Sequence, residues 1–91
     1  RPGHPDPRLK LGLAMEAAGR VEDALIAYES ALEVYPGHLG AMQALTACEL
    51  KHGRVDDATL DRLSEVALRA QETRWREWAR REMTKREDTS R

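Results

Sequence analysis

The sequence predicts an all-α chain in which pairs of helices stack as a repeat. Leucine and alanine, with 11 and 13 residues, far outnumber valine and isoleucine, with four and one. Leucine and alanine favour helices, whereas β-branched residues favour strands. The chain also repeats itself: Gly-Arg-Val-Glu-Asp-Ala at 19–24 returns as Gly-Arg-Val-Asp-Asp-Ala at 53–58, which is 34 residues later. A period of this length indicates helical pairs or another repeat architecture.

The first predicted helix begins near Asp6, whose side chain can cap free backbone N–H groups. Leu11, Met15 and Ala18 follow at i, i+4 and i+7, which places them on one helical stripe. Gly19 is expected to end this helix in the left-handed conformation that glycine adopts readily.

Three further helices follow, each bounded by a breaker. We expect the second over about 21–35, ended by Pro36, and the third over about 39–52, ended by Gly53. The fourth is expected over about 55–70.

A fifth helix is expected over about 73–87, with a polar tail at 88–91 that frays. It carries Trp75 and Trp78 among six basic side chains, Arg74, Arg76, Arg80, Arg81, Lys85 and Arg86. Basic residues interleaved with aromatics can bind nucleic acid or an anionic surface. However, a glutamate precedes an arginine by four residues at 72–76, 77–81 and 82–86, an order typical of a solvent-exposed helix. We expect the tryptophans to pack on the fourth helix, with one partly exposed as a secondary interface.

Length and charge limit the functions that are open to the chain. We take 1–91 as a single domain, because 91 residues are too few for two. Basic and acidic side chains nearly balance, 15 against 16, which excludes a domain-wide nucleic-acid-binding surface. No apolar run approaches the roughly 18 residues that indicate a membrane helix. The single cysteine excludes an internal disulfide, and we expect a cytoplasmic protein.

The 34-residue period, with two helices in each period, resembles the tetratricopeptide repeat family. The first repeat, about 5–38, has the family's Leu-Gly pair at 11–12 and its turn glycine at Gly19. Its second helix has the family's small residue at Ala24, the aromatic at Tyr28 and the terminal proline at Pro36. The second, about 39–71, follows the family pattern only in its first half, because Arg62 stands where the aromatic belongs. The fifth helix resembles the capping helix that ends many such arrays.

The resemblance implies a short right-handed α-solenoid whose first helices line a concave groove for a peptide or a helix. Carried over to this chain, the groove residues are Leu9, Leu13, Glu16, Gln43, Ala47 and Leu50. Most of these side chains are apolar, and an exposed apolar strip indicates a partner site. Some relatives bind a carboxyl terminus through lysine and asparagine in the groove. The matching positions here hold Leu9, Leu13, Gln43 and Ala47, so we expect no such clamp.

We expect no metal site from the histidines. His4, His38 and His52 are not spaced four residues from one another, and none stands beside a cysteine. The first two occupy equivalent turns of the repeat. Cys48 has no identifiable base and falls 34 residues after Ala14, a small packing position, which favours a buried structural thiol.

No catalytic pattern is present either. The acidic pairs at 22–23 and 56–57 fall in the first turns of predicted helices, where the helix dipole favours negative charge. The sequence has no phosphate-binding loop and no dinucleotide fingerprint. We therefore expect neither an enzyme nor a cofactor.

The sequence favours a protein–protein interaction module. Its expected partner is a peptide, a helix or a second copy of the chain, held in the groove without covalent chemistry. Two alternatives stay open: binding of nucleic acid or an anionic surface by the basic fifth helix, and a purely structural segment of a longer solenoid. The motif Pro-Gly-His at 2–4, which returns at 36–38, leads us to expect that the chain is part of a longer protein.

Overall fold

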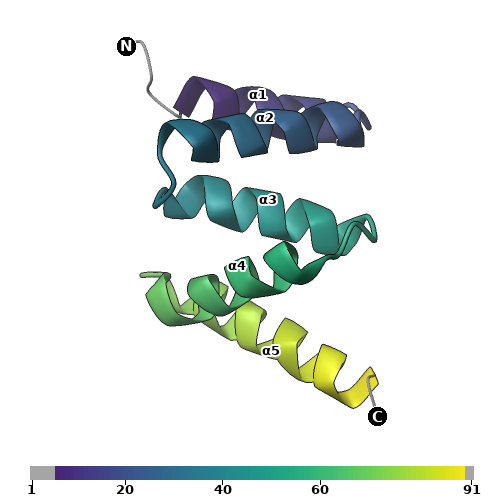
Figure 1. The fold of residues 1–91 in the computed structure, drawn as a ribbon, viewed down its shortest axis with the longest axis vertical. Helices are drawn as coiled ribbons and strands as arrows, with labels where there is room; N and C mark the ends of the chain where they lie inside the picture. The colour runs from purple at the N-terminus through teal and green to yellow at the C-terminus, as the bar shows by residue number, and fades with distance from the viewer. Residues whose placement is uncertain (1–5, 90–91) are drawn as a thin grey trace.

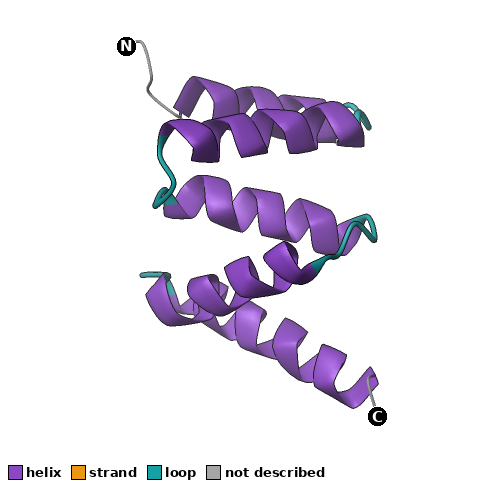
Figure 2. Ribbon diagram, viewed as in Figure 1, coloured by secondary structure: helices purple, strands orange, loops and turns teal. Residues whose placement is uncertain are grey.

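The computed structural model describes residues 6–89 as five α-helices, with no strand in this range. They are α1 (Asp6–Ala17), α2 (Val21–Val34), α3 (Leu39–Lys51), α4 (Asp57–Arg69) and α5 (Thr73–Thr89). The helices are stacked in a zigzag from one end of the molecule to the other (Figures 1 and 2). Each helix packs against the next, and α1 also contacts α3. The prediction of an all-α helical repeat is confirmed.

The helix ends lie close to the predicted ones. Gly19 and Gly53 have φ values of 81° and 72°, so each ends a helix in the left-handed region, as expected. The fourth helix begins two residues later than predicted, because Asp56 serves as its N-cap. The fifth continues to Thr89, through two residues of the tail that we expected to fray. Residues 90–91 and the Pro-Gly-His motif at 2–4 lie outside the described residues.

Close packing of α1 on α2 depends on Gly12. A Cβ added to Gly12 would lie 2.5 Å from Cδ1 of Tyr28, whose ring is fully buried. The Tyr28 hydroxyl donates a hydrogen bond to Oε1 of Glu16 at 2.7 Å, which holds the ring against α1. Tyr28 belongs to a core formed by α2 and α3, with Ala24, Leu25, Leu45 and Cys48.

The prediction that Leu11, Met15 and Ala18 form the apolar stripe by which α1 packs was wrong. Leu11 is 50% exposed and Ala18 is exposed, and only Met15 of the three packs against the core. The buried side of α1 instead presents Leu9 and Gly12. Leu45, which stands 34 residues after Leu11, is 1% exposed because the α1–α2 pair covers α3. Within residues 6–89 no helix covers α1 in the same way.

A second core lies between α3, α4 and α5. Its buried side chains are Met42, Leu63, Val66, Ala67, Ala70 and Ala79. Trp75, Trp78 and Met83 of α5 pack against it and stay partly exposed. The tryptophans thus pack against a core to which α3, α4 and α5 all contribute, and their expected contact with the fourth helix alone stays a prediction. The two cores divide the stack along α3.

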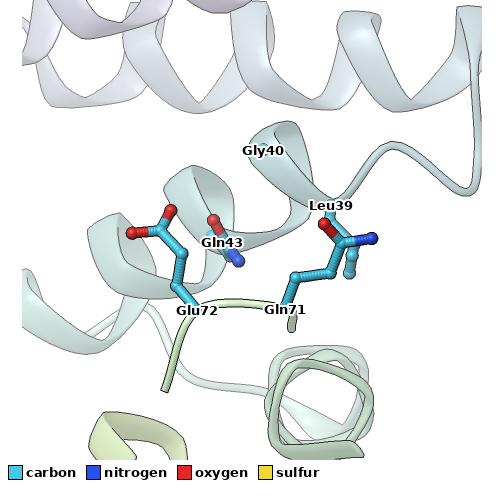
Figure 3. A pocket seen from close by; sticks show the side chains of 5 residues that line it. All are labelled: Leu39, Gly40, Gln43, Gln71 and Glu72. Atoms are coloured by element: carbon cyan, nitrogen blue, oxygen red, sulfur yellow. The ribbon is translucent and has the colours of Figure 1, made fainter. Parts of the chain in front are cut away.

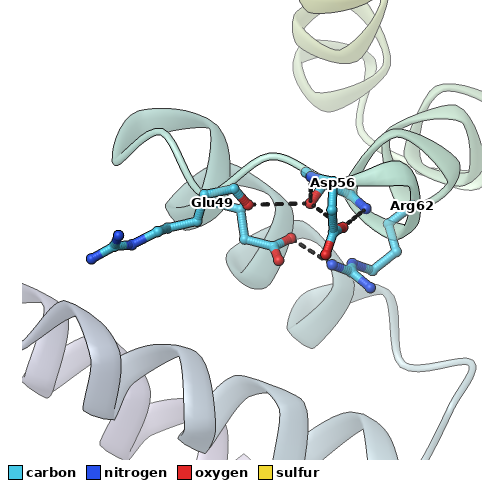
Figure 4. A network of polar contacts seen from close by, with 5 residues as sticks. Glu49, Asp56 and Arg62 are labelled. Atoms are coloured by element: carbon cyan, nitrogen blue, oxygen red, sulfur yellow. Dashed lines mark hydrogen bonds and ion pairs between the residues drawn. The ribbon is translucent and has the colours of Figure 1, made fainter.

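Polar side chains fix the connection from α3 to α4 (Figure 4). Asp56 and Thr59 form a reciprocal capping box: Asp56 Oδ1 accepts from the Thr59 amide at 2.9 Å, and Thr59 Oγ1 accepts from the Asp56 amide at 3.2 Å. The Thr59 hydroxyl also donates to Asp56 Oδ1, at 3.0 Å, and the hydrogen bonds that the Thr59 amide and hydroxyl donate to this carboxylate lower the pKa of Asp56. Arg62, which replaces the aromatic of the first repeat, pairs with the mostly buried Glu49 at 2.5 Å.

Candidate groove and polar cluster

Three neighbouring hollows form one groove along α3. Gly40, Gln43 and Ala47 recur at i, i+3 and i+7, so they share one face of the helix. Gly40 and Gln43 line a central hollow between α1 and α5 and also a polar hollow next to the α4–α5 connection. Ala47 lines the central hollow and another hollow beside Trp75 and Trp78. This face of α3 is therefore the floor of the groove.

The central hollow lies between α1 and α5 and has a volume of about 280 Å³. Leu9, Leu13 and Glu16 line it from α1, and Trp75 lines it from α5. Leu13 is 50% exposed, and the other three are partly buried. Apolar surface from three helices, with one carboxylate at its edge, thus faces solvent in one place.

The hollow beside the tryptophans has a volume of about 290 Å³ and is lined by Ala47, Arg74, Trp75 and Trp78. The two indole rings meet edge to face, with their centroids 5.3 Å apart. This arrangement is favourable for aromatic pairs, so each ring restrains the other. Trp75 is shared with the central hollow and forms the wall between them.

The third hollow is the polar end of the groove. Gln71 and Glu72 extend from the α4–α5 connection toward Gln43 on α3 (Figure 3). Oε2 of Glu72 is paired with Nε of Arg74 at 3.0 Å, and both side chains are largely exposed. Amide and charged groups here can set the register of a bound chain.

Five of the six groove residues expected from the sequence lie together in the central hollow: Leu9, Leu13, Glu16, Gln43 and Ala47. Leu50 does not line it. Its side chain packs against the second core instead. The hollow also contains Gly40, Ala44 and Trp75. Trp75 was expected at a separate, secondary interface, and the structure places it in the groove itself.

Comparison with known proteins supports this architecture. The tetratricopeptide repeat family model matches residues 5–48, which include α1, α2 and most of α3. Residues 5–48 carry the sequence pattern of a tetratricopeptide repeat. Tetratricopeptide repeats generally mediate protein–protein interactions and are typically non-catalytic. No curated protein and no solved structure gives a significant match to the chain. Among residues 6–89, no helix is long and apolar enough to cross a membrane.

A polar cluster lies where the end of α1 meets the end of α3. It consists of Glu16, Cys48 and His52, whose potential ligand atoms all lie within 4.8 Å of one another. His52 Nε2 is 3.7 Å from Glu16 Oε2, and Cys48 is fully buried, as expected. Burial and then the Glu16 carboxylate raise the pKa of Cys48 to about 11.

Sequence reasoning missed this cluster. His52 follows Cys48 by four residues, a spacing that places both side chains on one helical face. That signal was present, but a cysteine was sought only directly beside a histidine, and the four-residue spacing was weighed only between histidines. The contribution of Glu16 depends on how α1 crosses α3, and no local pattern in the sequence reports it.

The basic side of α5 lies outside the tetratricopeptide repeat match. Arg80, Arg81 and Lys85 line a shallow hollow on this helix. Lys85 pairs with Glu82 at 2.9 Å. Arg76 does not pair with Glu72 as expected, because its guanidinium donates to the carbonyl of Ala70 at 2.9 Å. Acidic neighbours and backbone carbonyls therefore engage part of the positive charge that nucleic acid would need.

Proposed function

We propose that the chain binds a peptide or a helix of a partner protein in the groove along α3. The observation that carries this proposal is the central hollow, in which apolar side chains from α1, α3 and α5 face solvent together. Exposed apolar surface gathered in a concavity is where a partner's side chain gains most from leaving water. Binding therefore takes the form of a bulky apolar side chain seated between Leu13 and Trp75.

The groove fits a side chain better than a cofactor. Its central volume of about 280 Å³ is at the lower edge of the ~300–1,000 Å³ that small-molecule sites occupy. Glu16 at its edge and Gln43 on its floor offer acceptors and donors that fix direction. We expect the partner segment to carry a leucine, methionine or aromatic residue followed by polar residues that meet these groups.

The same groove argues against recognition of a free carboxyl terminus. No basic side chain lines the central hollow, and Gln43 is the one amide among Leu9, Leu13 and the other residues that line it. Glu16 adds a negative charge that would repel a carboxylate. An internal segment of the partner, rather than its last residue, is therefore the proposed occupant.

The proposal assigns a role to each part of the stack. We take α1–α2 as the first repeat, α3–α4 as the second and α5 as the capping helix. The cap serves the site directly, because Trp75 closes one side of the groove. Terminal elements of repeat proteins cover apolar surface that would otherwise be left open. The cytoplasmic location expected from the sequence stays a prediction.

Selection from a phage-displayed library of random peptides tests this proposal. We expect the selected peptides to share a bulky apolar residue and to change the fluorescence of Trp75 when they bind. Leu13→Asp should weaken their binding by about 100-fold or more, because a buried unpaired carboxylate costs several kcal/mol. The matched control is Leu68→Asp. Leu68 is 80% exposed on α4 and lines none of the three hollows of the groove.

Three outcomes are distinguishable. Loss of binding in Leu13→Asp with retention in Leu68→Asp supports the groove. Equal binding by both variants places the peptides elsewhere and overturns the assignment. The third outcome is that a second copy of the chain occupies the groove, and light scattering over a range of concentrations detects it as a rise in molar mass. A dimer that Leu13→Asp dissociates would replace the external partner by self-association through the same surface.

A further inference from the structure

We propose that Glu16, Cys48 and His52 form a binding site for Zn²⁺ at the junction of α1 and α3. Thiolate, imidazole and carboxylate are the three protein ligands that zinc accepts. All three side chains meet here with their ligand atoms within 4.8 Å of one another. This site requires no partner, and it shares Glu16 with the central hollow.

The backbone positions two of the ligands in advance. The amide of His52, the C-cap residue of α3, donates to the carbonyl of Cys48 at 3.1 Å. This bond fixes the two residues one turn apart on the same face. A pair of ligands spaced by four residues on a helix needs little further ordering to reach one ion.

The third ligand is held by a neighbour that is not a ligand. Tyr28 donates its hydroxyl proton to Oε1 of Glu16 at 2.7 Å. Oε2 is the oxygen that lies 3.7 Å from Nε2 of His52. A hydrogen bond that orients a ligating carboxylate in this way is typical of the outer shell of metal sites.

The distances require only a small contraction. Zinc bonds of ~2.0–2.3 Å place ligand atoms of a tetrahedral site roughly 3.3–3.8 Å apart. The pair formed by Glu16 and His52 already lies in this range. Both of these side chains are partly exposed, at 22% and 29%, so the ion can enter and His52 can adjust toward Cys48.

Binding replaces a proton by a metal ion. The Cys48 thiol releases its proton to solvent and its sulfur bonds to Zn²⁺, while His52 binds as the neutral imidazole. Three protein ligands leave the fourth tetrahedral position for a water molecule. The ion would also neutralise the carboxylate at the edge of the central hollow, since Glu16 lines it.

Cobalt substitution tests the site. We expect one equivalent of Co²⁺, added to the metal-free chain without an affinity tag, to produce a thiolate-to-cobalt charge-transfer band that Zn²⁺ removes. Zn²⁺ should also raise the Tm, with saturation at one equivalent. Cys48→Ala and His52→Ala should lose the band and the rise in Tm. Tyr28→Phe, which removes only the orienting hydroxyl, should weaken Co²⁺ binding by about 10–100-fold.

The control is His38→Asn. His38 lies at the start of α3, where its ring accepts from the Ala41 amide, and asparagine preserves such a cap. This variant should keep the band in full. No band in the wild-type chain, or a band that survives in His52→Ala, would overturn the proposal. If Cys48→Ala fails to fold by circular dichroism, the wild-type spectrum and His52→Ala still decide the question.

Discussion

Substitution of Gly12 by alanine should destabilise the protein, although alanine is the better helix former. The new Cβ would lie 2.5 Å from Cδ1 of Tyr28. That ring cannot simply swing away, because it is fully buried and its hydroxyl is hydrogen-bonded to Glu16. The contact between α1 and α2 must therefore open.

The magnitude follows from two opposing terms. Replacing glycine by alanine inside a helix gains about 1 kcal/mol, whereas forcing extra volume into a packed core costs roughly 1–3 kcal/mol. The contact with Tyr28 is severe and the ring is rigid, so the upper part of that range applies. We expect a net loss of about 1–2 kcal/mol in the free energy of unfolding, which lowers the Tm by roughly 5–15 °C in a domain of this size.

A double-mutant cycle with Tyr28→Leu isolates the cause. In the Tyr28→Leu background the clash is gone, so Gly12→Ala should stabilise the chain by up to ~1 kcal/mol through helix propensity. Urea unfolding followed by circular dichroism measures all four proteins. The reasoning is refuted if Gly12→Ala stabilises the wild-type chain, or if its effect is the same in both backgrounds.

Two further substitutions have defined outcomes. The hydroxyl of Thr46 is fully buried and has no hydrogen-bond partner among the described residues. Thr46→Val should therefore raise the free energy of unfolding by about 1 kcal/mol. A loss of stability in urea unfolding would contradict this prediction. Asp56→Ala should lower the Tm at pH 7, since it removes the capping acceptor of α4. The folded protein lowers the pKa of Asp56 below 3.8, so the stabilisation is complete above that pH and is lost as the pH falls through the folded pKa. The difference in Tm between Asp56→Ala and wild type should therefore shrink in acid, and a constant difference down to pH 2 would refute the assignment.

Most of the fold could be predicted from local signals. The 34-residue period and the breakers at Gly19, Pro36 and Gly53 located the turns, because these positions depend on backbone conformation within a few residues. Five groove residues followed from the resemblance to the tetratricopeptide repeat, whose first helices line the groove. What failed was the prediction of which apolar residues are covered. Leu11 and Leu45 have the same local pattern, yet only Leu45 has a helix pair packed over it.

The parts of the site that were missed depend on contacts between helices. Leu50 packs against the second core, which α3, α4 and α5 form together, and Trp75 of α5 lines a hollow whose other residues belong to α1 and α3. Glu16 reaches Cys48 and His52 only through the crossing of α1 over α3. Sequence spacing reports the face of one helix, whereas these positions require the relative placement of two.

The two walls of the groove are fixed by different helix–helix contacts. The Leu13 side belongs to α1, which is fixed to α2 through Gly12 and Tyr28 and also contacts α3. The Trp75 side belongs to α5, whose principal packing partner is α4. A small rotation of α5 on α4 would widen or narrow the groove at the tryptophans and leave the α1 wall in place. The α1 wall is therefore the rigid side of the groove and the α5 wall is the adaptable side. Partners should share the residue that contacts Leu13 and vary in the residue that contacts Trp75.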